Sequence, residues 1–293
     1  MEDLEIKAHT SPELESLIRL LADDHETMQS AVNARLIELG EGIVPSLWDA
    51  RTEVTDVVRS RIDGILVRLS SEAGETLALT EWRELFQFEG DVDLERGVCA
   101  LAKLHTPDLN WAETSEALDS MADEIAIRLS GITEPNDIVE AFIQYVFKDQ
   151  AYRGGEDATY FDPDGHYMDR VIARKSGVPI ALSAVCLLLA TRINLPLFGV
   201  GLPDHFVVKY QRDDAEILFA PFHDGAIITR EECEQFIIRQ KLTFTDEILT
   251  PVTNRYILER MLANLRQLYL HKDDREKTDM VAQYARTVRG DLP

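Results

Sequence analysis

Few residues in this sequence have side chains suited to catalysis or metal binding and also lie at a spacing that would bring them into one site. The three cysteines, Cys99, Cys186 and Cys233, are too few and too scattered for a disulfide framework or a zinc knuckle. Cys186 lies in the middle of an apolar segment, away from the helix end that would lower the pKa of a thiol, so we interpret it as buried and inert. The sequence contains neither a glycine-rich phosphate-binding loop nor a Gly-x-Ser-x-Gly elbow.

His205 is the histidine that supports a chemical hypothesis. It directly precedes an alternating apolar segment, 206–210, that predicts a strand. In one interpretation its imidazole transfers protons within a catalytic site. In the other it is a half-buried strand histidine bonded to a backbone carbonyl. The sequence alone leaves both interpretations open.

Side chains suited to zinc occur in three separate loops around this strand, on His166, Asp204, His205 and His223. They lack the short spacing of a zinc motif, so we expect no metal site and no cofactor. The segment 162–169, DPDGHYMD, lacks the spacing and the terminal Glu of a calcium-binding EF-hand. It therefore favours an Asx-type turn.

A strongly apolar helix is expected to position these residues. From Val178 to Ala190 only Ser183 is clearly polar, and apolar residues fall on every face, so we expect neighbouring elements to cover the helix on every side. Pro179 suits its first turn, where a missing N–H is tolerated. The apolar segment is shorter than the roughly 20 residues that cross a membrane, which indicates a core helix.

Three segments after this helix alternate in the manner of strands: 197–201, 206–210 and 216–219. Thr229, followed three residues later by Glu232, forms the capping box of a further helix. Before the apolar helix, the segment 150–169 predicts a long loop, of a length often found at functional sites.

Most of the remaining chain has helical periodicity: 11–50 (three helices), 52–71, 80–88, 94–104, 112–129, 136–148, 253–270 and 273–288. The first helices resemble a HEAT-type repeat, and the last two a single tetratricopeptide-like unit. We therefore predict a helix-dominant α+β fold. It has a HEAT-like N-terminal region (1–90), a core with a small antiparallel sheet on the buried helix (91–245), and a C-terminal helical hairpin (246–293).

The chain of 293 residues is strongly acidic, with a net charge of −23. This charge argues against a nucleic-acid partner, which needs a cationic face. Residues 251–293 carry eight Lys or Arg against six Asp or Glu, a net charge of +2, so the preceding residues carry −25. The N-terminus has no basic and apolar segments of a secretory signal, and we expect a cytoplasmic protein with no membrane partner.

Several ordered motifs resemble the bacterial SirB-type transglutaminase-like proteins. They are Tyr152-Arg153-Gly154, Tyr160-Phe161-Asp162-Pro163, the segment 174–183, Leu195-Pro196-Leu197, the segment 199–203, His205-Phe206 and Pro221-Phe222. The resemblance covers 95–230 and, more loosely, the whole length. It implies a helical N-terminal part, a transglutaminase-like core and a tetratricopeptide-like tail; a related core occurs in a eukaryotic F-box protein.

Enzymes with this core use a Cys-His-Asp triad, with the Cys at the N-terminus of the buried helix. The resemblance places these three positions at Pro179, His205 and Ala220, so only the histidine is retained. The SirB-type family commonly lacks the Cys as well. This chain departs further from the family at Asp204, where a Gly is usual, and at Gly165-His166, where an Asn-Ser pair is usual.

We therefore expect a non-enzymatic, degenerate transglutaminase-like protein that acts as a protein-binding or regulatory module. The candidate rim of its cleft consists of Tyr160, His166, Asp204 and His205. The expected partner is another protein, and the sequence gives no prediction of an oligomeric state. The alternative is a hydrolase or transferase with altered chemistry, which would use His205 with Cys186 or with a bound metal.

Overall fold

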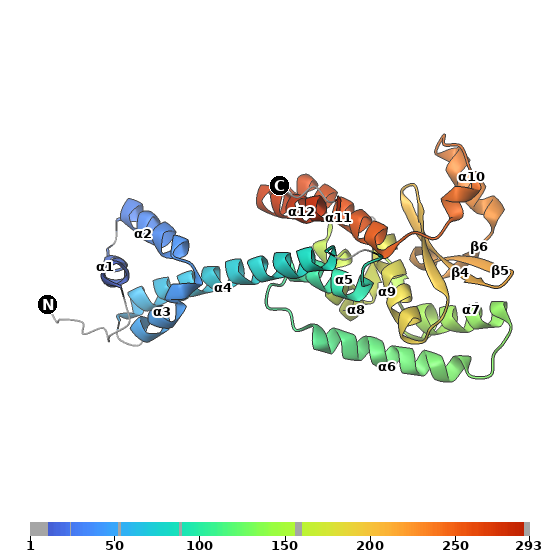
Figure 1. Ribbon diagram of the computed structural model, residues 1–293, viewed down its shortest axis with the longest axis horizontal. Coiled ribbons are helices and arrows are strands. Elements are labelled where there is room, and N and C mark those ends of the chain that lie inside the picture. Colours follow the sequence, from blue (N-terminus) through green and yellow to red (C-terminus); the bar gives the residue numbers. More distant parts are fainter. Residues whose placement is uncertain (1–10, 24, 52–53, 88–89, 156–159, 290–293) are drawn as a thin grey trace. The chain divides into compact units, whose positions relative to one another are not determined.

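The structure is a computed structural model that describes residues 11–23, 25–51, 54–87, 90–155 and 160–289. The chain divides into two compact units, Met1–Ala78 and Leu79–Pro293 (Figure 1). The boundaries that the sequence suggests, after residues 90 and 245, stay predictions.

The described part of the first unit is helical. Its elements are α1 (Pro12–Leu20), α2 (Glu26–Glu38), the short η1 (Glu41–Ile43), α3 (Val44–Arg51) and the N-terminal part of α4 (Asp56–Leu85). Ser11 caps α1 by accepting a hydrogen bond from the N–H of Leu14, and Pro12 occupies the first helical position, as expected. These helices bury an apolar cluster of their own. The HEAT-like assignment stays a prediction.

One helix replaces two in the expected order of elements. Most of the predicted segments 52–71 and 80–88 belongs to a single helix, α4, while residues 52, 53 and 88 lie outside the described residues. Gly74 lies between the two predicted segments, but one interior glycine destabilises a helix by only about 1 kcal/mol relative to alanine. This is too little to end a helix of this length.

The second unit continues from the end of α4 and contains the remaining elements. Its helices are α5 (Leu94–Lys103), α6 (Trp111–Leu129), α7 (Pro135–Ile143) with the π-helical η2 (Gln144–Asp149), α8 (Met168–Arg174), α9 (Pro179–Arg192), α10 (Arg230–Arg239), α11 (Asn254–His271) and α12 (Arg275–Arg289). Short turns η4 (Pro163–Gly165), η5 (Pro221–His223) and η6 (Asp246–Leu249) connect them. The expected capping box is present, because Thr229 and Glu232 exchange hydrogen bonds at the start of α10.

A four-stranded antiparallel sheet crosses the unit in the order β3-β4-β5-β6. Its strands are β3 (Leu197–Leu202), β4 (His205–Arg212), β5 (Ala215–Ala220) and β6 (Ala226–Ile228). The three predicted strands are confirmed, whereas β6 was not predicted. Nor was the short parallel pair of β1 (Arg153–Gly154) and β2 (Ser176–Gly177), which ties the predicted loop to the start of α9.

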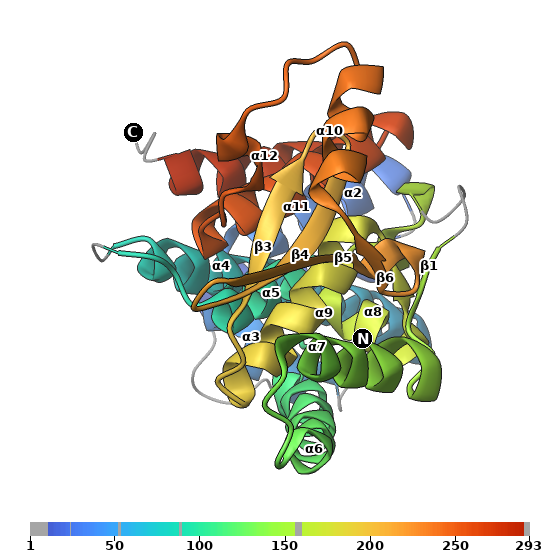
Figure 2. The same ribbon diagram turned by 90° about the vertical axis from the view of Figure 1, so that its right-hand side faces the viewer.

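The buried helix α9 is the centre of this unit. All residues from Pro179 to Ala190 are buried, as the sequence predicts. Strands β3 and β4 lie against it on one side (Figure 2), and α5, α6, α8 and α11 contact it elsewhere. Each fully buried leucine, isoleucine or valine contributes roughly 1.5–3 kcal/mol of transfer free energy, so the position of α9 is strongly fixed.

The predicted helix-dominant α+β class, with a small antiparallel sheet on a buried helix, is confirmed. None of the helices in the described ranges is long and apolar enough to cross a membrane.

Gly154 provides a test of this packing. A Cβ atom added at Gly154 would lie 2.2 Å from the carbonyl oxygen of Phe222, which belongs to the main chain of η5 and cannot rotate away. We expect Gly154→Ala to lower the free energy of unfolding by about 1–3 kcal/mol, measured by urea denaturation with circular dichroism.

The matched control is Gly64→Ala in α4, where an added Cβ would contact nothing within 4 Å. This variant should be unchanged or more stable by up to about 1 kcal/mol, because alanine favours a helix. Equal stability of the Gly154→Ala variant and the wild type would contradict the close approach of β1 and η5.

Candidate functional site

The N-terminus of α9 holds the first of the three positions that correspond to a catalytic triad. Pro179 is the first residue of the helix, and its side chain lines a surface hollow of about 440 Å³. The N–H of Val178, just before the helix, donates to the carbonyl of Gly165, and this bond fixes the turn that leads into α9. A proline has neither an ionisable side chain nor a backbone N–H, so this position offers no nucleophile and no backbone donor.

His205 begins β4 and faces the same hollow as Pro179. Aromatic rings surround its imidazole: those of His223, Phe236 and Phe222 lie 5.3, 5.9 and 6.4 Å away between ring centroids. Burial and, secondarily, His223 lower the pKa of His205 to about 4, so its ring is neutral at physiological pH. Of the two interpretations that the sequence leaves open, the half-buried strand histidine fits this burial, but no hydrogen bond joins its ring to a backbone carbonyl within the part of the chain that the structure describes.

Ala220, the third position, is the last residue of β5. It lines a second hollow of about 390 Å³, between the sheet and α10, which also contains His205, His223 and Cys233. We call this the α10 hollow. His205 therefore lines both the α10 hollow and the hollow at Pro179. The methyl group of Ala220 supplies no carboxylate that could orient the imidazole of His205.

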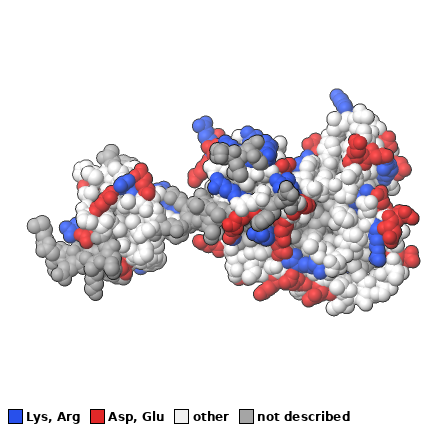
Figure 3. Space-filling view, viewed as in Figure 1, with Lys and Arg blue, Asp and Glu red and all other residues white. Residues whose placement is uncertain are grey.

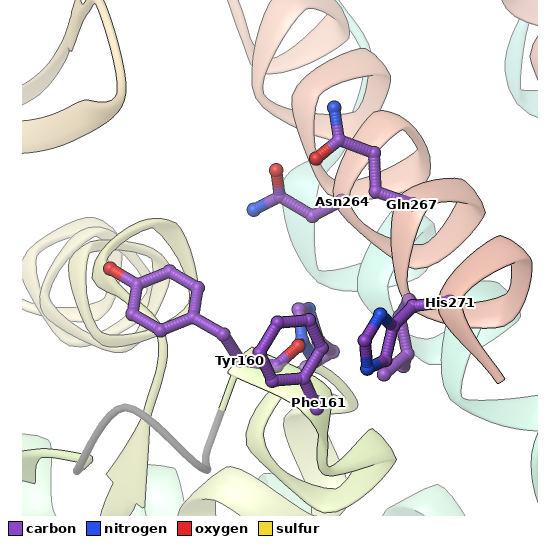
Figure 4. A pocket seen from close by; sticks show the side chains of 7 residues that line it. Tyr160, Phe161, Asn264, Gln267 and His271 are labelled. Atoms are coloured by element: carbon purple, nitrogen blue, oxygen red, sulfur yellow. The ribbon is translucent and has the colours of Figure 1, made fainter.

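A third hollow adjoins the one at Pro179 and shares three of its lining residues, Tyr160, Asn264 and Gln267. This third hollow has a volume of about 510 Å³. We call the two adjoining hollows the α11 groove, because α11 forms one of their walls. The loop around Tyr160 and the start of α9 form the other (Figure 4).

The α11 groove contains all four residues that the sequence suggests as a cleft rim. Tyr160 lines both of its hollows, Asp204 and His205 line the hollow at Pro179, and His166 lines the other. The structure therefore brings these residues together, while their role in binding stays a prediction.

His166 is buried, unlike an exposed residue at the rim of a cleft. It is 6 % exposed, and its Nε2 lies 3.1 Å from the carbonyl oxygen of Tyr160. Because a carbonyl only accepts, this nitrogen carries the proton. Burial lowers the pKa of His166, so the ring stays neutral and holds the Tyr160 loop in place.

The residues that sequence reasoning missed lie on α11. Arg260, Asn264, Gln267 and His271 recur at intervals of four, three and four residues and so lie along one side of the helix. This polar stripe is visible in the sequence, next to the buried residues of α11. The stripe is not assigned to a site from the sequence because α11 belongs to the segment that predicts a separate C-terminal hairpin.

The other chemical candidates lie outside these hollows or serve the fold. Cys186 is completely buried, and burial raises the pKa of its thiol. Asp162 accepts a hydrogen bond from the N–H of Asp164, which confirms the expected Asx-type turn. Among the described residues, no group of three or more His, Cys, Asp or Glu side chains could hold a metal ion.

Comparison with known proteins connects this site to a family. The sequence profile described as the transglutaminase-like superfamily matches residues 112–263, slightly more than half of the chain. A UPF0162 protein of Xylella fastidiosa is 28 % identical over 209 residues, which cover 68 % of this chain and 73 % of that protein. A UPF0162 protein of Vibrio cholerae is 24 % identical over 187 residues, 62 % of this chain and 68 % of that protein.

The similarity extends to part of a larger mammalian protein. F-box only protein 21 of mouse is 31 % identical over 135 residues, which cover 43 % of this chain and 21 % of that protein. No solved structure gives a significant match.

The low pKa of His205 predicts a specific pH dependence. In an unfolded chain a histidine has a pKa of about 6.5, above the folded value of about 4. The unfolded chain therefore binds the proton more readily. The contribution of neutral His205 to stability is present in full above about pH 6.5 and is lost as the pH falls towards 4.

We expect NMR titration to give a pKa near 4 for the His205 ring, and His205→Phe to flatten the fall of the urea midpoint between pH 6.5 and 4. Burial also lowers the pKa values of His105 and His166, but both remain in the variant, so the difference between the proteins isolates His205. A pKa at or above 6.5 would show that the ring is solvated rather than enclosed.

Proposed function

Because the chain belongs to the transglutaminase-like superfamily, we propose that it is a non-enzymatic member that binds a partner protein through the α11 groove. The observation that carries this proposal is Pro179 at the first position of α9. In the triad chemistry, this position provides a thiolate that the helix N-terminus stabilises. Proline at this position retains the helix start and removes the nucleophile.

The remaining thiols are poor substitutes for that nucleophile. Cys186 is two helical turns further along α9 and fully buried. Cys233 shares the α10 hollow with His205 but is only 2 % exposed, and burial, with a smaller effect of Glu232, raises the pKa of its thiol. Burial raises the pKa of Cys99 to about 11. At neutral pH each of these groups is a protonated thiol, which is a weak nucleophile.

The environment of His205 also supports the proposal. A general base works best when its pKa lies near the working pH, and a pKa of about 4 makes His205 a weak proton acceptor at pH 7. Its neighbours are the rings of Phe222, His223 and Phe236 rather than a carboxylate. The site retains the α11 groove, a surface hollow between two walls of the protein. Hollows of this kind are suited to binding a ligand.

Two finer assignments belong to the same proposal. We assign the chain to the SirB-type branch on the strength of its ordered motifs from Tyr152 to Phe222. We also propose that it acts in the cytoplasm. The alternative, a hydrolase or transferase with altered chemistry, would use His205 with Cys186 or with a metal; the shared α10 hollow makes Cys233 a further thiol to test.

Thiol reactivity tests the loss of the nucleophile. In the folded protein, we expect iodoacetamide to modify Cys186 and Cys233 only after unfolding and Cys99 more slowly than free cysteine, because burial raises each pKa. The measurement is the alkylation rate of each peptide by mass spectrometry across a pH series, with and without urea. Fast modification of folded Cys186 or Cys233 near pH 6, slowed by His205→Ala, would restore the enzymatic alternative.

The variant Pro179→Cys provides the positive control for that experiment. A thiol at the first position of α9 would face the α11 groove and the positive end of the helix dipole. We expect it to react at least about tenfold faster than any native thiol of the folded protein at pH 7.

A direct activity assay tests the non-enzymatic assignment. We expect the wild-type chain to show no incorporation of a fluorescent primary amine into a glutamine-containing protein, and no hydrolysis of peptide or ester substrates, because a nucleophile and an orienting carboxylate are missing. The double variant Pro179→Cys/Ala220→Asp introduces a thiol and a carboxylate at these two positions. It tests whether the lack of these two groups accounts for the expected absence of activity. Wild-type turnover that disappears in His205→Ala, in Cys186→Ser or with a chelator would overturn the assignment.

A further inference from the structure

The helical hairpin of α11 and α12 contains cations that have no ion-pair partner among the residues that the structure describes. The segment 251–293 has a net charge of +2, whereas the rest of the chain carries −25. None of its eight lysines and arginines forms an ion pair with any residue in the described ranges. Elsewhere in the second unit, Arg128, Arg174 and Arg192 each bind at least one carboxylate. Figure 3 shows Lys and Arg side chains gathered over this hairpin.

Arg260 is the cation of this hairpin that lines the α11 groove. Arg255 donates a hydrogen bond to the carbonyl of Val288 and lies over the ring of Phe86, whereas Arg260 makes no such contact with the described residues. The residue is nevertheless half-buried. Partial burial removes water from a guanidinium group without supplying an anion, which disfavours the empty groove and strengthens the attraction to a bound carboxylate.

Two amide side chains continue the same wall. Asn264 and Gln267 lie one and two turns beyond Arg260 on α11, and neither side-chain amide forms a hydrogen bond within the described part of the chain. Each amide offers both a donor and an acceptor, so the pair matches the alternating N–H and C=O groups of an extended peptide. The opposite wall contains Pro179 and Ile180 from α9.

The far end of the groove is aromatic. Phe161 is 49 % exposed, and its ring lies 4.1 Å from that of His271 between centroids. Figure 4 shows these two rings side by side and in contact, below the amides of α11. An apolar side chain of the occupant would bury this surface at the end opposite Arg260.

We infer that the occupant of the α11 groove is an extended peptide segment with a glutamate or aspartate side chain, whose carboxylate binds Arg260 and whose main chain bonds to Asn264 and Gln267. The inference rests on the proposed binding function and specifies the chemistry of the partner. A peptide with a single carboxylate fits better than a nucleic acid, because the groove presents one cation. Asp204 in the same hollow and the net charge of the chain oppose any anion, and they oppose a row of phosphates far more than one carboxylate.

Peptide arrays test this inference with the full chain. The probes are extended peptides of about eight residues with varied flanks, in which the central residue is Glu, Gln or Lys. We expect the Glu set to bind at least about tenfold tighter than the Gln set at low salt, since a bidentate arginine–carboxylate pair is stronger than a neutral hydrogen bond. The preference should shrink at high salt.

Two variants of α11 locate the effect. Arg260→Gln should abolish the preference for Glu over Gln, and Arg260→Glu should shift it to the Lys set. The matched control is Arg266→Gln, because Arg266 is exposed on the same helix and lines none of the hollows described above. This control should keep the preference within about twofold, and circular dichroism verifies that all variants are folded.

The outcomes separate this inference from the proposed function. Binding of all sets with no preference for Glu would overturn the carboxylate inference and leave a peptide-binding groove. An equal loss in Arg260→Gln and Arg266→Gln would assign the preference to the general charge of the hairpin and overturn the inference. Displacement of the Glu peptides by a single-stranded oligonucleotide would overturn it in favour of nucleic acid. Absence of binding by every set would overturn both the inference and the use of the groove.

Discussion

The enclosure of α9 is the constraint on which the second unit depends. A helix that is apolar on every face must be covered on every side, so β3 and β4 lie against it and α5, α6, α8 and α11 surround the rest. A helix held so firmly keeps its N-terminus in a constant place relative to β4 and β5. The positions of Pro179, His205 and Ala220 are therefore consequences of packing and are retained whichever side chains occupy them.

Because packing alone holds these positions, the fold is compatible with the proposed loss of activity. Proline is among the most suitable residues for the first position of a helix, so Pro179 fits the frame while it removes the nucleophile. His205 is held by aromatic neighbours instead of a carboxylate, and its pKa falls with burial. Packing thus places His205 between the hollow that Pro179 lines and the hollow that Ala220 lines, and the proposed loss of activity rests on the side chains at these positions.

The α11 groove depends on residues that are distant in the sequence. One wall comes from the loop at Tyr160 and Phe161 and the start of α9, and the other comes from α11, about a hundred residues later. The pair of hydroxyl groups on Tyr167 and Tyr269, 2.7 Å apart and buried, joins these two regions. Because the interior is close-packed, this contact limits movement of the segment after the loop relative to α11.

The sequence by itself determined the features that depend on local signals. The fully apolar segment from Val178 predicted α9, and the helix starts at Ser11 and Thr229 and the Asx turn at Asp162 followed from hydrogen bonds within a few residues. Tertiary structure decided the rest. It merged two predicted helices into α4, paired β1 with β2, buried His166, and turned the polar stripe of α11 into a groove wall. The physical reason is that capping and periodicity are local, whereas burial and the surfaces left uncovered depend on which distant segments meet.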